Sequence, residues 1–273
     1  MQLAIVLATV DRPDAVRRVI TDVRGQLRPG DELVVIDQSA TPIEAPDVRV
    51  IARSERSLPA ARNAGIAATT APIVVFFDDD VALHPGCLDA HRAAYADPTV
   101  GGAVGRIVEA TLRPNARSTT NRVGRTGRIR TRLDGDAEVA IETLKGANMS
   151  LRRQALAEVG PFDPAYLGTA LLEDADLSTR VRRAGWALRY LPTAAVDHHH
   201  LPTGGVRTPD PLRWRFYNTG YFVRRHHRRA LDPLVVATHA AIAVRAALRA
   251  REPAVAPRLL AAFVRGWRRG AGP

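Results

Sequence analysis

Short runs of apolar residues alternate with helical patterns along the first third of the chain. The apolar runs cover residues 2–8, 32–36, 48–52 and 73–77. Runs of this length without polar interruptions are typical of strands that are buried on both faces. Helical patterns follow the first, third and fourth runs, so the order of elements predicts an α/β fold with a mostly parallel sheet and helices on both of its faces.

Residues that favour helix starts mark where these helices begin. We expect Asp11 to cap the first helix, with Pro13 in its first turn. Ser57 is expected to cap the second helix, and Pro85 to open a third that runs to about Tyr95.

The middle of the chain predicts further strands and helices. The predicted strands cover residues 100–110, 138–141 and 187–191. A turn at residues 146–150 is expected to lead into a helix that ends at Gly160, and a second helix over residues 171–184 is stopped by Gly185. A Gly204-Gly205 turn follows the last strand, and no internal repeat is visible.

Residues 112–133 contain seven arginines and no acidic residue, interleaved with Gly, Asn and Thr. This composition predicts a long loop rather than a strand or a helix. Two interpretations stay open at this point. The loop is a solvated excursion, or it is a lid that closes over an anionic ligand.

The net charge of the 273-residue chain is +11, from 39 basic and 28 acidic side chains. Residues 1–206 hold equal numbers of the two, so the excess lies in residues 207–273, where 14 arginines face three acids. A charge confined to one end does not indicate a nucleic-acid-binding body, and we expect no nucleic-acid partner. The tail also predicts three helices, over about residues 211–229, 232–250 and 255–268.

Other features exclude whole classes of protein. Apolar residues make up 46% and charged residues 25% of the chain, as in ordinary globular proteins. The single cysteine, Cys87, excludes an internal disulfide framework and a multi-cysteine zinc site. The first ten residues predict a strand rather than a signal peptide. No run of 18 apolar residues occurs, so we expect no transmembrane helix.

Three consecutive aspartates, Asp78, Asp79 and Asp80, follow the fourth apolar run. Thr9 and Asp37 end the first two runs, so all five residues are expected at one rim of the sheet, where such folds bind ligands. Adjacent carboxylates repel one another, and a divalent cation that also binds substrate phosphates is the usual remedy. The alternative is an acidic turn that caps the following helix.

Glu173 and Asp174 open a predicted helix, and two explanations fit them. Acidic residues stabilise the first turn of a helix through its dipole. One carboxylate that lines a cleft is also placed to act as a general base, provided that it reaches the hydroxyl it deprotonates.

Three histidines follow the last predicted strand. In an extended segment His198 and His200 share one face while His199 points away, so either outer histidine is a candidate ligand for the same cation. A surface feature without a ligand is the alternative.

Together these segments resemble the family-2 inverting glycosyltransferases with the GT-A fold, from residue 2 to about residue 205. The segments that carry the resemblance are AIVLATVDRP, VVIDQS, ARNAGI, VVFFDDDV, GANMSLRRQALAEVGPFDP, LLEDADLSTRVRRAGW and HHHLPTGG. The resemblance implies a catalytic domain over residues 1–206, with a nucleotide-binding half to about residue 110 and an acceptor half after it. A basic helical extension then covers residues 207–273.

The resemblance also implies roles for individual residues. It places Thr9, Asp37, Arg62, Asn63, Asp78 and Asp79 beside the nucleotide, and Gly146 and Asn148 beneath the donor sugar and acceptor. It implies Mg²⁺ or Mn²⁺ on Asp80, with His198 or His200 completing the metal shell. It makes Asp174 the general base, with Glu173 as its catalytic neighbour.

The implied activity is metal-dependent transfer of a sugar, with inversion, from a nucleoside-diphosphate sugar to the hydroxyl of a glycan, a lipid-linked saccharide or a small molecule. The processive members' Gln-x-x-Arg-Trp signature is absent, because Arg213-Trp214 lacks its glutamine. A single addition is therefore expected. The alternatives are a nucleotidyltransferase and a nucleotide-sugar-binding protein without turnover, and the first lacks a phosphate-cradling glycine loop.

Arginine and aromatic residues mix in the tail, as they do in helices that lie at membrane surfaces. The arginine and aromatic residues of this stretch are Arg213, Arg215, Arg224, Arg225, Arg228, Arg229, Trp214, Phe216, Tyr217, Tyr221 and Phe222. One interpretation is a cytoplasmic enzyme held peripherally on the inner face of the cell membrane, where a lipid-linked acceptor is found. The other is a set of helices packed onto the catalytic domain or forming a homodimer face.

Overall fold

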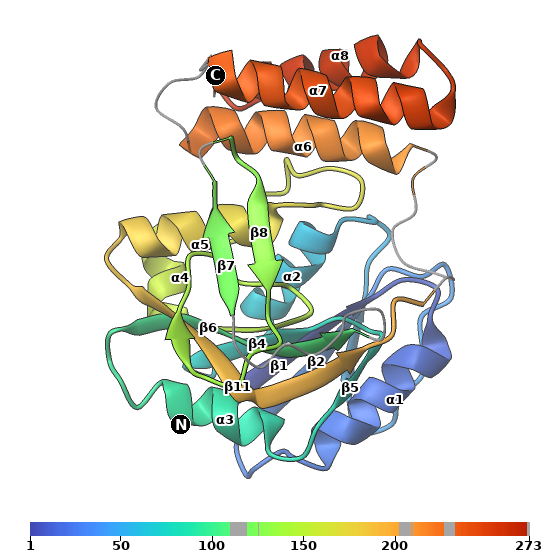
Figure 1. The fold of residues 1–273 in the computed structure, drawn as a ribbon. Helices are drawn as coiled ribbons and strands as arrows, with labels where there is room; N and C mark the ends of the chain where they lie inside the picture. The colour runs from blue at the N-terminus through green and yellow to red at the C-terminus, as the bar shows by residue number, and fades with distance from the viewer. Residues whose placement is uncertain (110–118, 125, 202–207, 209, 227–232, 272–273) are drawn as a thin grey trace.

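The computed structural model describes residues 1–109, 119–124, 126–201, 208, 210–226 and 233–271 (Figure 1). Its strands are β1 (Leu3–Thr9), β2 (Glu32–Asp37), β3 (Arg49–Ala52), β4 (Ile73–Phe77), β5 (Val81–Leu83), β6 (Val100–Glu109), β7 (Thr120–Val123), β8 (Ile129–Arg132), β9 (Val139–Ala140), β10 (Asn148–Arg152) and β11 (Ala187–His198). Its helices are α1 (Pro13–Arg24), α2 (Leu58–Ala67), α3 (Cys87–Ala94), α4 (Arg153–Val159), α5 (Glu173–Arg183), α6 (Pro211–His226), α7 (Pro233–Ala250) and α8 (Val255–Arg269).

The central sheet has the strand order β3-β2-β1-β4-β10-β6-β11-β5, with β9 paired to β11. Strands β3, β2, β1 and β4 are parallel, as are β6 and β11. Strand β10 is antiparallel to both of its neighbours, β4 and β6. The predicted α/β architecture with a mostly parallel sheet is confirmed.

Helices cover both faces of this sheet. In Figure 1, α1 and α3 lie beneath the sheet, and α2, α4 and α5 lie above it. Every residue of β4 is buried, which explains its unbroken apolar sequence. Helix α1 turns an apolar stripe toward the core, formed by Ala15, Val16, Val19, Ile20 and Val23.

The N-cap predictions for α1 and α2 have different outcomes. Ser57 caps α2 as expected, since its side chain accepts a hydrogen bond from the Ala60 N–H. The prediction for Asp11 is wrong, because Arg12 occupies the N-cap position of α1. Asp11 adopts a left-handed backbone conformation, with φ of 53°, and its carboxylate pairs with Arg56 instead.

Several predictions for the middle of the chain are corrected. Residues 148–152 form β10 at the centre of the sheet, not a turn into a helix, and α4 begins only at Arg153. Strand β11 continues to His198 rather than ending at Leu191. The short strand β5 was not predicted. The Gly204-Gly205 turn lies outside the described residues.

The arginine-rich segment after residue 118 is not a loop. Its described part forms an antiparallel hairpin of β7 and β8, in which Thr120 pairs with Arg132 and Val123 with Ile129. In Figure 1 this hairpin rises from the sheet toward α6. It therefore connects the region above the sheet to the C-terminal helices.

The three predicted tail helices are present and stack as a layer above the rest of the chain (Figure 1). Tyr221 and Phe222 of α6 are buried in a cluster with Tyr166, Leu172 and Ala175. These two aromatic residues therefore pack α6 onto the body of the protein, while Phe216 packs against α7 and α8. Arg228 and Arg229 lie outside the described residues.

Helix α7 differs from its neighbours because much of its apolar surface is uncovered. Leu234, Val236, Val244 and Leu248 are each 46% exposed or more. By length and composition alone α7 qualifies as a helix that could cross a membrane, with a mean hydropathy of 1.3 and 22% of its residues buried. This criterion uses length and composition alone, so the expectation that the chain has no transmembrane helix stays a prediction.

Candidate active site

The sheet brings the predicted rim residues together. Thr9 and Asp37 are register partners at the ends of β1 and β2. The Thr9 hydroxyl donates to Oδ2 of Asp79 over 2.7 Å. Asp37 is fully buried, and its two oxygens accept 2.8 Å hydrogen bonds from the N–H groups of Ser39 and Ile43. Asp37 thus shapes the loop that leaves β2.

The three consecutive aspartates have different surroundings. Asp79 is buried and is held by Thr9 and by Arg12, whose Nη1 lies 2.6 Å from Oδ1 of Asp79. Burial raises the pKa of Asp79, while these two hydrogen bonds oppose the rise. The charge on Asp79 is therefore balanced inside the protein, while Asp78 and Asp80 each have one oxygen near His198.

Arg12 was missed by the sequence analysis. Besides Asp79 it contacts Oδ2 of Asp80 at 3.1 Å and donates to the carbonyl of Leu201 over 2.9 Å. It therefore ties the start of α1 to the chain after β11. Its position between Thr9 and Pro13 was the only indication in the sequence. Arginine is so common in this chain that a single arginine there did not stand out.

Asp78, Asp80 and His198 form a group that fits a divalent cation. Nε2 of His198 lies 3.2 Å from Oδ1 of Asp80 and 3.9 Å from Oδ2 of Asp78. One atom from each residue lies within 4.8 Å of the others. Ligands about 2.1 Å from a shared ion have such separations. Against the effect of burial, hydrogen bonds from His198 and the Leu201 N–H lower the pKa of Asp80 to about 2.

His200 belongs to a neighbouring group. Its ring centroid is 3.8 Å from that of His198, as the alternation of an extended segment predicts. Its Nε2 lies 3.3 Å from Glu109, and Glu109, His198 and His200 form a second set of atoms within 4.8 Å of one another. His198 is thus the histidine that joins the two aspartates.

Arg62 connects this acidic group to the start of α5. The side chain is 3% exposed, and its Nη2 lies 3.2 Å from Oδ1 of Asp78 while Nη1 pairs with Glu173. The guanidinium also lies over the rings of Phe76 and Phe162. Arg62 therefore holds Asp78 and Glu173 in fixed positions within the protein.

Glu173 and Asp174 have different surroundings at the start of α5. Glu173 is buried beside Arg62, and its second oxygen has no hydrogen-bond partner among the described residues. Burial raises the pKa of Glu173, against the lowering effect of Arg62. Asp174 instead lines a pocket, and its oxygens accept from the N–H groups of Gly146 at 3.1 Å and Ala175 at 2.8 Å. Of the two carboxylates, Asp174 is the one that a substrate can reach.

The remaining predicted residues support the site from inside the fold. A Cβ at Gly146 would collide with the guanidinium of Arg62, so a larger residue would have to displace this buried group. The amide of Asn148 binds His91 and the carbonyls of Arg106 and Ala194. The amide of Asn63 exchanges two hydrogen bonds with the backbone of Phe162.

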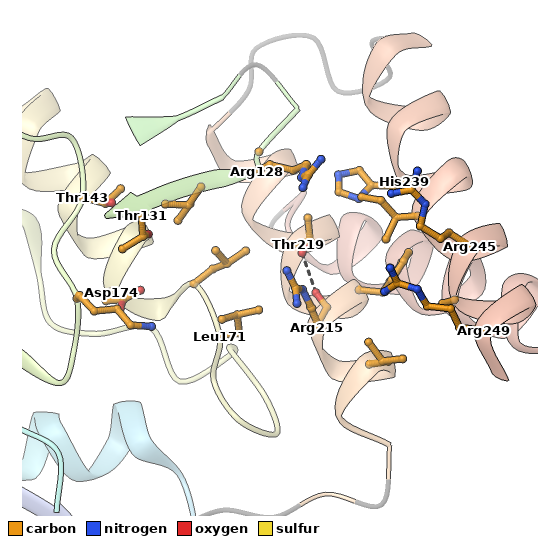
Figure 2. Close-up of a pocket in the computed structure, with 18 of the residues that line it drawn as sticks. Arg128, Thr131, Thr143, Leu171, Asp174, Arg215, Thr219, His239, Arg245 and Arg249 are labelled. Carbon is orange, nitrogen blue, oxygen red and sulfur yellow. Dashed lines mark hydrogen bonds between the residues drawn. The ribbon is translucent and has the colours of Figure 1, made fainter. Parts of the chain in front are cut away.

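A pocket of about 690 Å³ extends from Asp174 to the C-terminal helices. Figure 2 shows Asp174, Thr131 and Thr143 at one end and His239, Arg245 and Arg249 at the other. Helices α6 and α7 and the hairpin of β7 and β8 form its walls. The tail therefore contributes to the cavity that contains the exposed carboxylate.

Residues 2–217 match the protein family described as glycosyltransferase like family 2. The chain belongs to this family.

Among curated proteins, family relatives include the pre-mycofactocin glycosyltransferase of Mycobacterium tuberculosis, 32% identical over 213 residues. That match covers 72% of this chain and 43% of the relative. The N-acetylglucosaminyl-diphospho-decaprenol L-rhamnosyltransferase of the same organism is 27% identical over 173 residues, which are 56% of this chain and 55% of the relative. The chain thus matches about half the length of these relatives.

Two solved glycosyltransferases share the fold. The crystal structure of GalNAc-T7 with UDP, GalNAc and Mn²⁺ has a TM-score of 0.68 at 15% identity, covering 85% of this chain and 49% of that one. The mannosyltransferase PcManGT from Pyrobaculum calidifontis, in complex with GDP-Man and Mn²⁺, has a TM-score of 0.57 at 18% identity, covering 99% and 76%. The expected GT-A fold of a family-2 glycosyltransferase is therefore confirmed.

Proposed function

We propose that the chain transfers one sugar, with inversion, from a nucleoside-diphosphate sugar to an acceptor hydroxyl. The observation that carries this proposal is that Asp174 lines a large pocket and is linked, through Gly146 and Arg62, to Asp78 of a group of metal-binding character. Membership of the glycosyltransferase family and the nucleotides and Mn²⁺ named with the two solved structures support it. Arg213 and Trp214 lack the glutamine of the processive signature, which supports a single addition.

In the proposed reaction Asp174 acts as the general base. It takes the proton from the acceptor hydroxyl while that oxygen attacks the anomeric carbon from the face opposite the leaving nucleoside diphosphate. One displacement of this kind inverts the anomeric centre. Hydrogen bonds from Gly146 and Ala175 orient the carboxylate toward the pocket.

Asp78, Asp80 and His198 are the proposed holders of the divalent cation. When bound, Mg²⁺ or Mn²⁺ supplies Lewis-acid neutralisation of the leaving diphosphate. Arg12 and Thr9 fix Asp79 and so position the aspartates on either side of it. Arg62 holds Asp78 from below, and the nucleotide is proposed to lie over Thr9 and Asp37 at the rim of the sheet.

Product analysis tests this proposal. Donor hydrolysis or transfer should require Mn²⁺ or Mg²⁺, and NMR of the anomeric proton should show inversion. Transfer without divalent cation, or retention of configuration, contradicts it. Transfer of a nucleotidyl group instead of a sugar would assign the chain to a different class of enzyme.

We also propose that α7 contacts the inner face of an anionic membrane. Leu234, Val236, Val244 and Leu248 supply exposed apolar surface, and Arg245 and Arg249 lie on the same helix. Apolar insertion combined with basic flanks is the pattern of interfacial helices. Sedimentation with liposomes of 30% phosphatidylserine (roughly the charge of such leaflets) should capture the chain at low salt. Failure to bind, with a concentration-dependent dimer in its place, assigns this face to a homodimer.

A further inference from the structure

The pocket that begins at Asp174 carries a strong excess of positive charge. Asp174 is the single carboxylate among its lining residues. The cationic residues that line it are Arg128, Lys145, Arg215, Arg245 and Arg249. Three of the five, Arg215, Arg245 and Arg249, come from the cationic tail, and the other two come from the neutral body of the chain.

Within the described part of the chain, none of these five cations forms an ion pair with a carboxylate. By contrast, the buried Arg62 is paired with Glu173, whereas the four arginines of the pocket are exposed. Cations that face one cavity repel one another, and the repulsion is relieved when an anion enters. The pocket is therefore built to receive negative charge.

The four arginines come from three separate parts of the fold. Arg128 precedes β8, Arg215 lies on α6, and Arg245 and Arg249 lie on α7 (Figure 2). His239 of α7 lies 3.0 Å from the carbonyl of Thr126, which joins the hairpin to α7. The hairpin that carries Arg128 and the helix that carries Arg245 and Arg249 are therefore in direct contact at one end of the pocket.

The opposite end of the pocket has a different chemistry. Thr143 is fully buried, lines the pocket, and its hydroxyl has no hydrogen-bond partner among the described residues. Figure 2 shows it on the same side as Asp174. An unsatisfied buried hydroxyl costs free energy until a ligand supplies the bond. This end suits a hydroxyl-bearing ligand.

We propose that the acceptor is a saccharide that carries a phosphate or diphosphate group, with its hydroxyl at Asp174 and Thr143 and its phosphate among Arg215, Arg245 and Arg249. This inference rests on the proposed function, because it takes Asp174 as the base. Guanidinium groups match phosphate oxygens in a two-pronged geometry, and several of them suit the multiple charge of a phosphate. The phosphate belongs to a water-soluble sugar phosphate or to a lipid-linked saccharide.

Calorimetric titration of the full chain in EDTA tests the inference. The probes are glucose 1-phosphate, farnesyl diphosphate and the neutral methyl glucoside. At least one phosphate probe should bind ten-fold or more tightly than methyl glucoside. Binding of glucose 1-phosphate indicates a soluble acceptor, and binding of farnesyl diphosphate alone indicates a lipid-linked one. Equal or undetectable binding of all three overturns the inference.

Variants locate the binding site. Arg245→Gln with Arg249→Gln should weaken the phosphate probe by about ten-fold or more, because two charge-assisted hydrogen bonds are lost. Arg245→Lys with Arg249→Lys should keep most of the affinity. The matched control, Arg265→Gln with Arg268→Gln, removes the same charge from α8 outside the pocket and should bind as the wild type does. Equal losses in both glutamine pairs overturn the proposed site.

Nucleotide binding distinguishes a failure of the acceptor inference from a failure of the proposed function. Binding of UDP or GDP with Mn²⁺ should be unchanged in Arg245→Gln with Arg249→Gln. If a nucleotide binds with Mn²⁺ and no phosphate probe binds in the pocket, the acceptor inference alone is wrong. If no nucleotide binds to the wild type with Mn²⁺, the proposed function fails first.

Discussion

Asp174 accepts a 3.1 Å hydrogen bond from the backbone N–H of Gly146. Gly146 in turn packs against the guanidinium of Arg62, which binds both Asp78 and Glu173. The proposed base and one of the proposed metal ligands thus share a single support. This relationship holds the pocket at Asp174 and the rim of the sheet in a fixed arrangement.

Asp174→Asn should abolish transfer while donor binding stays nearly unchanged. The asparagine oxygen can still accept from Gly146, so the local structure is kept and the proton acceptor is lost. Loss of a general base lowers the rate by about 10²- to 10⁴-fold. Steady-state kinetics and donor titration measure the two effects. Full activity in this variant would rule out Asp174 as the base.

Arg62→Met should destabilise the protein by about 3–5 kcal/mol, because it leaves the buried Glu173 without its partner. Urea unfolding monitored by circular dichroism measures the change in the free energy of unfolding. The double variant Arg62→Met with Glu173→Gln should recover part of the loss. If the two single losses simply add in the double variant, Arg62 and Glu173 are not energetically coupled.

Stability should fall as the pH is lowered from about 6.5 to 4, partly because of His91. This residue is fully buried, and its ring nitrogens lie 2.8 Å from Ser150 Oγ and Asn148 Oδ1. Burial lowers the pKa of His91 to about 4, with the Asn148 hydrogen bond opposing. Between pH 6.5 and pH 4 the unfolded chain binds a proton on His91 that the folded chain does not bind, so protonation favours the unfolded chain.

The variant His91→Gln tests this assignment. It should have a lower free energy of unfolding at pH 7, since Gln replaces only part of the hydrogen bonding. Its loss between pH 6.5 and 4 should be smaller than that of the wild type. An identical pH dependence in both proteins would assign the acid sensitivity to other groups.

Gly266→Leu should loosen α8 from α6, because a Cβ at this position would collide with the carbonyl of Tyr217. Overpacking of this kind costs about 1–3 kcal/mol. Thermal unfolding and hydrogen exchange of α8 would detect it. Val264→Leu, at an exposed position of the same helix, is the control and should have little effect. Equal exchange in both variants would contradict the close contact.

The fold was largely predictable because its strands are buried on both faces. The apolar runs of β1 and β4 are short and rich in Ile, Val and Phe, which favours buried strands, and the aspartates after β4 were expected at the rim. Strand β10 was missed because Asn148 and Ser150 are buried polar residues. Their alternation with Met149 and Leu151 was the available signal.

The sequence predicted which residues form the site, but not which partner each of them contacts. No local pattern distinguishes Asp79, which pairs with Arg12, from Asp78 and Asp80, which face His198. Those partners lie 67 to 120 positions apart in the sequence, so only the fold brings them together. The hairpin of β7 and β8 was missed for a similar reason, since its arginines border a pocket that tertiary contacts create.

Calorimetric titration of UDP and GDP into the full chain, with and without Mn²⁺, tests the central claim most directly. At least one nucleotide should bind with Mn²⁺ and bind ten-fold or more weakly in EDTA. Asp80→Ala should show the weak binding under both conditions, while the exposed-site control Asp14→Ala should match the wild type. Absence of nucleotide binding with Mn²⁺, or equal affinity in wild type and Asp80→Ala, would contradict the account.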